Sequence, residues 1–287
     1  MSLTGKINVD GFQLDYLIEG NGVPAFVVGS SLYYSRTFSQ NLRQSLKLVF
    51  VNHRGFSPPY DCQDKSLFEL DLLVDDVELV RKKLGFEQVI VIGHSGHGFI
   101  ALEYAKKYPN RVSHLVMISV APNFSQEASQ AAERYLQDSV CPERKAVLAE
   151  NLARLTEEIE AAPKKAFITY CLLNGAKSWF NYNYDATPLW ADVETNITMF
   201  DYVWGEVFRD LDITENLDKL QAPVFLALGR YDYLVPPFYL WENVRDKFND
   251  LTIRVFEESS HAPYFEQPDL FDKELLKWLF ASNRNKF

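Results

Sequence analysis

Short apolar runs separated by helical patterns are the feature of this sequence that most constrains its fold. Such runs are typical of strands that are buried on both faces of a sheet. They are "PAFVV", "LKLVFV", "QVIVIG", "SHLVMIS" and "APVFLALG". Helical periodicity lies between them at residues 37–46, at residues 67–84 with Gly85 as a stop, and in "GFIALEYAKKYP". Strands alternating with helices predict a mainly parallel sheet with helices on both faces.

The two ends of the chain extend this sheet. Residues 5–9 and 12–18 alternate polar and apolar side chains, as half-buried antiparallel strands do. After "APVFLALG" we expect a helix near 237–248, the strand "LTIRVF" and a final helix from Pro268 to Phe280. With the five buried runs, these segments predict eight strands.

One interval breaks the alternation. Between Ser119 and Pro223 the sequence has no convincing buried strand. Residues 127–172 are rich in Ala, Glu, Lys and Leu, which favours helix. Residues 179–208 are rich in aromatic side chains: Trp179, Phe180, Tyr182, Tyr184, Trp190, Phe200, Tyr202, Trp204 and Phe208. We interpret the interval as an inserted helical lid.

The stretch "GHSGHG", residues 93–98, directly follows "VIVI" and precedes a predicted helix. It fits the pattern G-x-S-x-G, which requires this strand–turn–helix context. The turn is so sharp that Gly93 and Gly98 must lack side chains, because these would collide across it. The Ser95 hydroxyl would then be exposed at the carboxyl edge of the sheet, near the positive end of the helix. We interpret Ser95 as a nucleophile rather than part of a structural turn.

A nucleophilic serine needs a base that takes its proton and an acid that orients the base. In this architecture they follow the serine in the order Asp or Glu, then His. "LALGRYDYLVP" supplies Asp232 and "FEESSHAPYFEQP" supplies His261, each in a loop after a predicted strand. Because both loops open on the same sheet edge as Ser95, we predict a triad of these three residues.

Acyl transfer also needs two N–H donors that stabilise the oxyanion. The backbone N–H of Gly96, next to the nucleophile, is expected to supply one. The other is expected from the loop after "AFVV", where we choose the N–H of Ser30 and keep that of Ser31 in reserve.

With these motifs the chain resembles the α/β-hydrolase fold family, in the broad group of esterases, lactonases, carbon–carbon hydrolases and proline iminopeptidases. The most specific pieces are "GHSGHGFIALEYAKKYPNRVSHLVMIS", "GRYDYLVP" and "SHAPYFEQP". The resemblance implies an α/β-hydrolase fold, with a mostly parallel eight-stranded sheet and a helical lid after the sixth strand. We accordingly expect residues 1–121 and 212–287 to form the α/β core, and residues 122–211 to form the inserted lid.

Two departures from the family pattern leave the subfamily open. Many members carry His-Gly before the oxyanion donor, but here Val28 precedes Gly29 and Ser31 replaces the usual proline. The usual "DxRGxGxS" turn reads "NHRGFSPPY", which loses its aspartate at Asn52 and one glycine. The backbone donor survives both changes, so catalysis is still expected.

Other classes of protein with this fold differ from an acyl hydrolase in the residues that they require. Dehalogenases and epoxide hydrolases of this fold use an aspartate nucleophile, so serine at position 95 disfavours them. Proline iminopeptidases usually carry a tryptophan after the nucleophile, where this chain has Gly96. They also carry acidic lid residues for the substrate amine, a role open to Glu194 or Glu206. A ligand-binding receptor could keep this fold, but the intact triad favours an enzyme.

The aromatic interval is interpreted either as core packing or as the wall of an acyl pocket, where apolar and partly polar side chains belong. For the second interpretation we name as substrate-binding residues Tyr33, Trp179, Trp190 and Trp204. Tyr34, also beside the oxyanion loop, would join the same wall.

Histidines near the nucleophile raise the question of a metal site. His94 and His97 flank Ser95, and His53 lies on a neighbouring loop, while zinc would need three converging ligands. Histidine at the position of His94 is common in the family without metal, so we expect packing or hydrogen bonding. The cysteines fit neither a disulfide framework nor a metal pattern: Cys62, Cys141 and Cys171. We expect reduced thiols, no metal and no cofactor.

Charge and hydropathy limit the partners. The formal net charge is −10 and no basic run is present, which argues against nucleic acid. The apolar runs are far shorter than the roughly 20 residues that span a bilayer. The stretch "MSLTGKINVDGF" lacks the apolar core of a secretory signal. We expect a cytoplasmic protein that acts on a small molecule without a membrane partner, and its oligomeric state is open.

These features together predict a cofactor-independent serine hydrolase. His261 would deprotonate Ser95, which attacks a carbonyl carbon, while Asp232 orients and stabilises the imidazolium. Two backbone N–H groups would bind the oxyanion, and water would then release the acyl group. We expect the substrate to be a small ester, thioester or lactone with an apolar portion.

Overall fold

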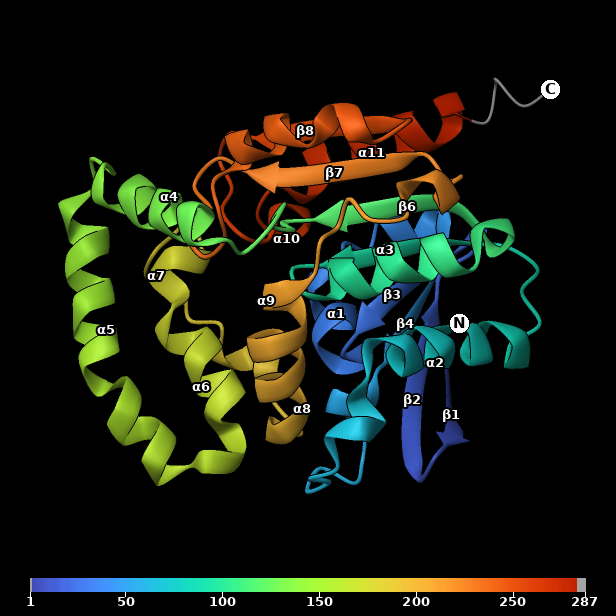
Figure 1. Ribbon diagram of the computed structural model, residues 1–287, viewed down its shortest axis with the longest axis horizontal. Coiled ribbons are helices and arrows are strands. Elements are labelled where there is room, and N and C mark those ends of the chain that lie inside the picture. The colour runs from blue at the N-terminus through green and yellow to red at the C-terminus, as the bar shows by residue number, and fades with distance from the viewer. Residues whose placement is uncertain (1, 283–287) are drawn as a thin grey trace.

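The computed structural model describes residues 2–282, which contain an eight-stranded sheet (Figure 1). Its strands are β1 (Leu3–Val9), β2 (Phe12–Glu19), β3 (Val23–Gly29), β4 (Leu46–Asn52), β5 (Val89–His94), β6 (Val112–Ile118), β7 (Val224–Gly229) and β8 (Leu251–Phe256). They lie in the order β1-β2-β4-β3-β5-β6-β7-β8. The β1–β2 and β2–β4 pairs are antiparallel and the other pairs are parallel. The predicted mostly parallel sheet is confirmed.

The direction in which strands are added reverses between β3 and β5. After β3 the chain crosses to β4 on one side, and then returns to form β5 on the other side of β3. The loops at the carboxyl ends of β3 and β5 therefore diverge and leave a crevice, where open α/β sheets bind their ligands. Ser30 follows β3 and Ser95 follows β5, so both begin at this crevice.

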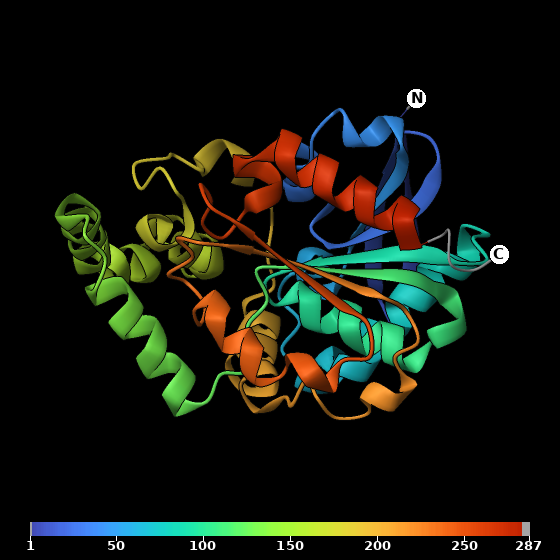
Figure 2. The ribbon, with the colours of Figure 1, turned by 90° about the horizontal axis from the view of Figure 1, so that it is seen from above.

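Helices cover both faces of the sheet. α2 (Leu70–Lys83) and α3 (His97–Lys107) lie against one face, and α11 (Pro268–Ser282), preceded by the short α10 (Pro263–Glu266), lies on the other (Figure 2). The stop expected after α2 is confirmed, because Gly85 has a φ of 72°. Such a left-handed residue is the usual end of an α-helix.

One helix begins earlier than the sequence pattern predicts. The expected helix at 37–46 is wrong: the helix is α1 (Ser31–Thr37), followed by a 3-10 turn, η1 (Leu42–Gln44). The hydroxyl oxygen of Ser30 accepts a hydrogen bond from the first turn of α1 and so caps it. The buried guanidinium of Arg43 donates to carbonyl oxygens at and beyond the end of α1. The following residues fold around that side chain instead of extending a helix.

The helix expected near 237–248 is also replaced by tighter structure. Two 3-10 turns occupy this stretch, η9 (Phe238–Asn243) and η10 (Arg245–Lys247). Trp241 is buried in the first turn, and its indole N–H donates to the carbonyl of Val120 at 2.8 Å. This contact with a distant loop fixes the turn, and it is not visible in local periodicity.

The segment between β6 and β7 leaves the sheet. Its elements are α4 (Gln126–Gln137), α5 (Pro142–Ala161), α6 (Ala166–Leu173), α7 (Gly175–Ser178), α8 (Ile197–Tyr202), the π-helical turn η7 (Val203–Val207) and α9 (Phe208–Asp210). Figure 1 shows α4 to α7 beyond the carboxyl end of β7, whose arrowhead points toward them. The helices expected in residues 127–172 are confirmed.

The central strands form the core. β5 and β7 are buried at every residue, as expected for strands covered on both faces. Among residues 2–282, no helix is both long enough and apolar enough to cross a membrane.

Candidate active site

Ser95 lies in the sharp turn between β5 and α3. Its φ of 56° is in the left-handed region, which residues other than glycine rarely adopt. A Cβ at Gly93 would collide with the backbone of His97 and Gly98, and a Cβ at Gly98 would collide with the side chain of Val120. The expected need for glycine at both positions is confirmed, although at Gly98 the cause is a neighbouring loop.

Asp232 and His261 are joined at the ends of β7 and β8. His261 Nδ1 lies 2.7 Å from Oδ2 of Asp232, and both side chains are buried. The other carboxylate oxygen accepts hydrogen bonds from the N–H groups of Leu234 and Val235, at 3.0 and 3.4 Å. These bonds hold the carboxylate toward the imidazole. A neutral His261 with its proton on Nδ1 has a lone pair on Nε2, as a general base requires.

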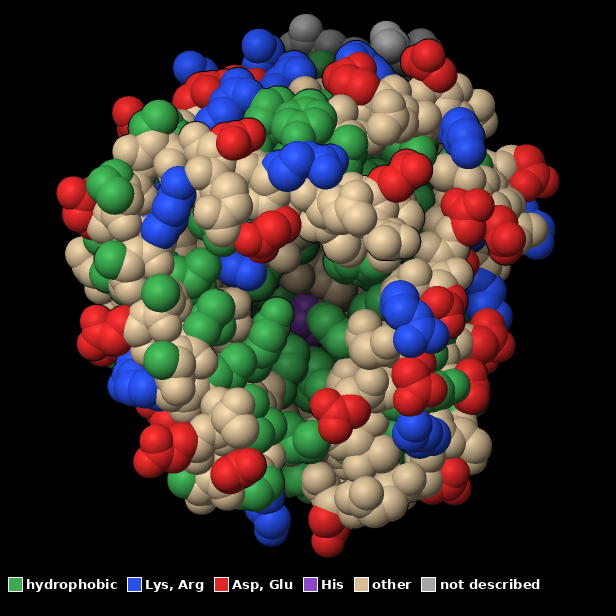
Figure 3. All heavy atoms as spheres, turned by 60° about the vertical axis from the view of Figure 1, so that its left-hand side comes forward, with side chains coloured by type: hydrophobic (Ala, Val, Ile, Leu, Met, Phe, Trp, Pro, Cys, Tyr) green, Lys and Arg blue, Asp and Glu red, His purple; other side chains and the backbone are tan. Residues whose placement is uncertain are grey.

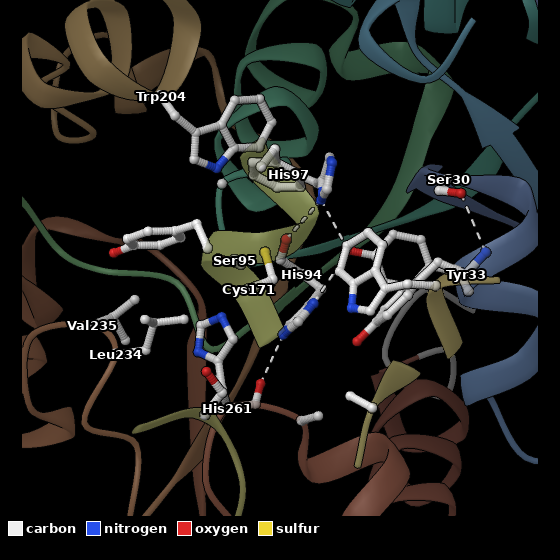
Figure 4. Close-up of a pocket in the computed structure, with 18 of the residues that line it drawn as sticks. Ser30, Tyr33, His94, Ser95, His97, Cys171, Trp204, Leu234, Val235 and His261 are labelled. Atoms are coloured by element: carbon white, nitrogen blue, oxygen red, sulfur yellow. Dashed lines mark hydrogen bonds between the residues drawn. The ribbon is translucent and has the colours of Figure 1, made fainter. Parts of the chain in front are cut away.

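Ser95 and His261 line the same cavity, whose volume is about 220 Å³ (Figure 4). The four residues expected to bind substrate line it as well: Tyr33, Trp179, Trp190 and Trp204. On the face shown in Figure 3 the surface is hollowed between apolar side chains, with a histidine at the base of the hollow. Asp232 does not line the cavity and reaches it only through His261.

Within the described part of the chain, no Asp, Glu, Lys or Arg lines this cavity. Glu206 is instead half exposed at the surface, where it pairs with Lys65 at 2.7 Å. Glu194 lines a neighbouring cleft, which shares Ser30 and Phe56 with the cavity. Neither glutamate that the sequence offers for binding an amine lies in the cavity wall.

The two expected oxyanion donors, Ser30 and Gly96, belong to residues that line the cavity. The N–H of Ser31, the reserve, donates to Asn52 Oδ1 at 2.6 Å and is therefore committed elsewhere. The Asn52 amide also donates to the carbonyl of Phe56 at 2.7 Å. An aspartate could accept the first bond but not donate the second. Asparagine at this position therefore ties two loops of the site together.

Part of the cavity wall lies outside the aromatic interval that the sequence suggests. Phe167, Tyr170 and Cys171 of α6 contribute to it. The signal for them is composition, because "AFITYCLL" is apolar on all sides and is flanked by polar helical segments. Burial raises the pKa of Cys171 to about 12, so this thiol is protonated at neutral pH.

The insertion is hydrogen-bonded to both loops that carry the base and its acid. The carbonyl of Ser178, at the end of α7, accepts the N–H of His261 at 3.0 Å. The carbonyl of Lys177 accepts the N–H of Tyr233, next to Asp232, at 3.1 Å. These bonds join backbone groups, so no side-chain pattern in the sequence identifies them.

The three histidines near the nucleophile form one hydrogen-bonded set, in which His53 contacts His97 directly and Tyr34 joins His97 to His94. Nε2 of His97 lies 3.0 Å from Nε2 of His53, and the Tyr34 hydroxyl lies 2.9 Å and 3.2 Å from Nδ1 of His97 and His94. The hydrogen bonding expected of these histidines is confirmed. In residues 2–282, no group of three or more His, Cys, Asp or Glu side chains is arranged to hold a metal ion.

A family model described as alpha/beta hydrolase fold matches residues 21–268 of this chain. The AB hydrolase superfamily protein YclE of Bacillus subtilis (strain 168) is 38% identical over 279 residues, which cover 97% of this chain and 99% of that protein. A proline iminopeptidase of Heyndrickxia coagulans is 24% identical over 293 residues, covering 94% and 96%. The solved structure of a proline iminopeptidase from Mycobacterium smegmatis has a TM-score of 0.72 at 19% identity, covering 97% of this chain and 98% of that one. The chain therefore belongs to the α/β-hydrolase fold family.

Proposed function

We propose that this protein is a serine hydrolase that cleaves a small, uncharged ester, thioester or lactone through an acyl-enzyme. One observation carries the proposal. Ser95 and His261 line the same cavity, and no Asp, Glu, Lys or Arg among residues 2–282 lines it with them. The left-handed backbone of Ser95 and the bond between His261 and Asp232 add support.

In the proposed reaction, Nε2 of His261 accepts the proton of Ser95 as the hydroxyl oxygen attacks the carbonyl carbon. Asp232 stabilises the imidazolium through Nδ1, and the N–H groups of Ser30 and Gly96 bind the oxyanion. His261 then gives its proton to the leaving group. A water molecule attacks the acyl-enzyme by the same route and regenerates Ser95.

The composition of the wall supports an apolar acyl group. Aromatic rings from the insertion, including Trp190 and Trp204, face the cavity. A free ammonium group bound there would lose its hydration without gaining a carboxylate partner, which costs several kcal/mol. We therefore propose that residues 122–211 act as a lid that shapes this pocket.

A proline iminopeptidase is the second candidate, because the relative from Heyndrickxia coagulans and the solved structure from Mycobacterium smegmatis carry that name. Such an activity would need an acidic side chain near the substrate amine. Glu206 is engaged with Lys65 at the surface, and Glu194 reaches only the neighbouring cleft. One of these glutamates would have to move into the cavity, which makes this candidate the weaker one.

The nucleophile is tested by labelling with a fluorophosphonate. We expect a covalent adduct on Ser95 in the wild type and none in Ser95→Ala. Hydrolysis of aryl esters should fall on the order of a millionfold in that variant, because triad residues act as a unit. An adduct on another serine would refute the assignment.

The substrate class is tested by comparing aryl esters of increasing acyl length with aminoacyl arylamides. If the aromatic wall binds the acyl chain, Trp190→Ala should raise KM most for the longest esters, since each buried methylene contributes about 0.8 kcal/mol. Glu194→Gln and Glu206→Gln should leave ester kinetics unchanged. Turnover confined to aminoacyl arylamides, and lost in either glutamine variant, would instead establish the peptidase.

A further inference from the structure

A buried set of hydrogen bonds connects the loop after β4 with the main chain of His261. Four side chains form it, and we call them the histidine–tyrosine network: His53, His97, Tyr34 and His94. In that order, the bonded atoms of successive members lie 3.0, 2.9 and 3.2 Å apart. Nε2 of His94 then lies 2.7 Å from the carbonyl oxygen of His261, and Figure 4 draws this bond as a dashed line.

The direction of these bonds follows from the first end of the network. The N–H of Gly55 can only donate, and it lies 3.0 Å from Nδ1 of His53. Nδ1 of His53 therefore carries the lone pair, and in the neutral ring the proton is on Nε2. That proton is donated to Nε2 of His97, which must accept.

The other end is compatible with the same direction, and the Tyr264 hydroxyl also lies 3.5 Å from Nδ1 of His94. The carbonyl of His261 can only accept, so Nε2 of His94 carries a proton and its Nδ1 accepts from the Tyr34 hydroxyl. The Tyr34 oxygen must then accept from Nδ1 of His97, which is also 3.2 Å from the carbonyl of His94. The tautomer of His97 that follows from the first end therefore satisfies both ends, and every bond then has one proton.

Burial keeps these imidazoles uncharged. Loss of hydration lowers the pKa of His53 to about 3. Loss of hydration lowers the pKa of His94 and of His97 well below the usual value, with a further contribution from neighbouring histidines. A second proton on His53 would face the N–H of Gly55, and a second proton on His97 would face the donating Nε2 of His53, so these two bonds require neutral rings.

We propose that the histidine–tyrosine network positions the general base, and that Tyr34 and His94 are positioning residues for His261. This inference rests on the proposed function, because it takes His261 to be the base. Three bonds fix His261: its N–H to the carbonyl of Ser178, its ring to Asp232, and its carbonyl to His94. The network orients the His94 ring that donates this third bond. The other end of the network is hydrogen-bonded to the N–H of Gly55, in the loop after β4.

Tyr34→Phe is the sharpest test, because it removes the hydroxyl that joins His97 to His94 and leaves the ring in place. We expect kcat for an aryl ester to fall roughly 10- to 100-fold, as for a base that is slightly misplaced, while KM changes less than twofold. The rate of fluorophosphonate labelling of Ser95 should fall by a similar factor. The downfield proton resonance of the His261–Asp232 bond should broaden or shift.

Tyr104→Phe is the matched control. It also removes a buried hydroxyl, whose bond to Glu78 Oε2 is 3.0 Å long, but it lies in α3 outside the cavity wall. We expect it to lower the melting temperature without changing kcat or the downfield resonance. A loss of activity that follows stability alone would appear in both variants.

A second pair of variants, at His94, tests the same proposal if Tyr34→Phe does not fold. His94→Gln retains an N–H donor that can reach the carbonyl of His261, whereas His94→Leu does not. We expect the first to keep at least tenfold more kcat than the second. Equal activity of the two variants would contradict the proposal.

The inference and the proposed function fail in different ways. If the wild type is neither labelled at Ser95 nor active on any ester, the proposed function is wrong. If the wild type is labelled and active but Tyr34→Phe retains its kcat, or changes KM alone, the positioning role is wrong and the hydrolase assignment stands.

Discussion

Gly96 has an ordinary helical backbone, with φ of −56° and ψ of −28°. Conformational strain therefore does not explain why the residue after the nucleophile lacks a side chain. A Cβ placed there would lie 2.5 Å from the indole of Trp204. Trp204, carried by the π-helical turn η7, fills the space beside the proposed oxyanion donor. The sequence shows a glycine at position 96. It does not show that Trp204 requires it, because the two residues are far apart in the chain.

This contact predicts a coupling between Gly96 and Trp204. Gly96→Ala should destabilise the protein by about 1–3 kcal/mol, as overpacking does. In a Trp204→Ala background the same substitution should cost little, because the obstructing ring is gone. Guanidinium unfolding of the wild type, both single variants and the double variant measures the coupling free energy. An identical loss in both backgrounds would show that Trp204 is not the obstacle.

Among the elements, α5 supports the site although it lies outside the cavity wall. Arg144 of α5 is buried, and its guanidinium donates hydrogen bonds of 2.7 to 2.8 Å to three carbonyl oxygens in the segment at the end of α7, those of Ala176, Trp179 and Phe180. The same segment contains Ser178, whose carbonyl accepts the N–H of His261. α5 is therefore linked to the proposed base through two successive hydrogen-bonded contacts.

Arg144→Met should loosen the end of α7 while keeping a long apolar side chain. Each hydrogen bond to a charged group contributes about 1.5–3 kcal/mol to stability, so the free energy of unfolding should fall by at least that amount. Ester hydrolysis should fall as Ser178 loses its fixed position. Arg154→Met, on the same helix, is the control, because Arg154 is half exposed and pairs with half-exposed Glu158. Equal stability and activity in the two variants would rule out the proposed support.

The sequence predicts those parts of the fold that depend on local pattern. The buried strands, the stop at Gly85 and the loops that carry Ser95, Asp232 and His261 follow from apolar runs and turn residues. The placement of α1 does not, because the buried guanidinium of Arg43 decides it by binding the carbonyls of Phe38 and Ser39. The turn around Trp241 does not either, because its indole binds the carbonyl of Val120, which is distant in the sequence. The apolar composition of α6 is visible in the sequence, but its place in the cavity wall depends on how distant segments pack.

For the molecule as a whole, the buried neutral histidines couple folding to pH. The pKa of His53 is lowered by burial from 6.5 to about 3, so between these values the ring binds a proton only when the chain is unfolded. Stability from this group is present above about pH 6.5 and is lost as the pH falls toward 3. Burial raises the pKa of the Glu266 and Asp272 carboxyls, which act in the opposite direction.

His53→Gln isolates the contribution of one histidine, because the carboxyls are unchanged in the variant. Between pH 6 and pH 5 we expect the wild type to lose about 1 kcal/mol more unfolding free energy than the variant does. Urea unfolding at several pH values measures the two slopes. Parallel slopes would mean that His53 takes up a proton in the folded protein.

The placement of the indole rings also gives the protein a built-in optical signal. Trp179, Trp190 and Trp204 line the cavity, whereas Trp241 and Trp278 do not. Indole emission depends on the polarity and mobility of its surroundings, so a ligand or an adduct on Ser95 changes the environment of the first three rings and not of the other two. Occupancy of the site can therefore be followed by intrinsic fluorescence, in real time and without a dye.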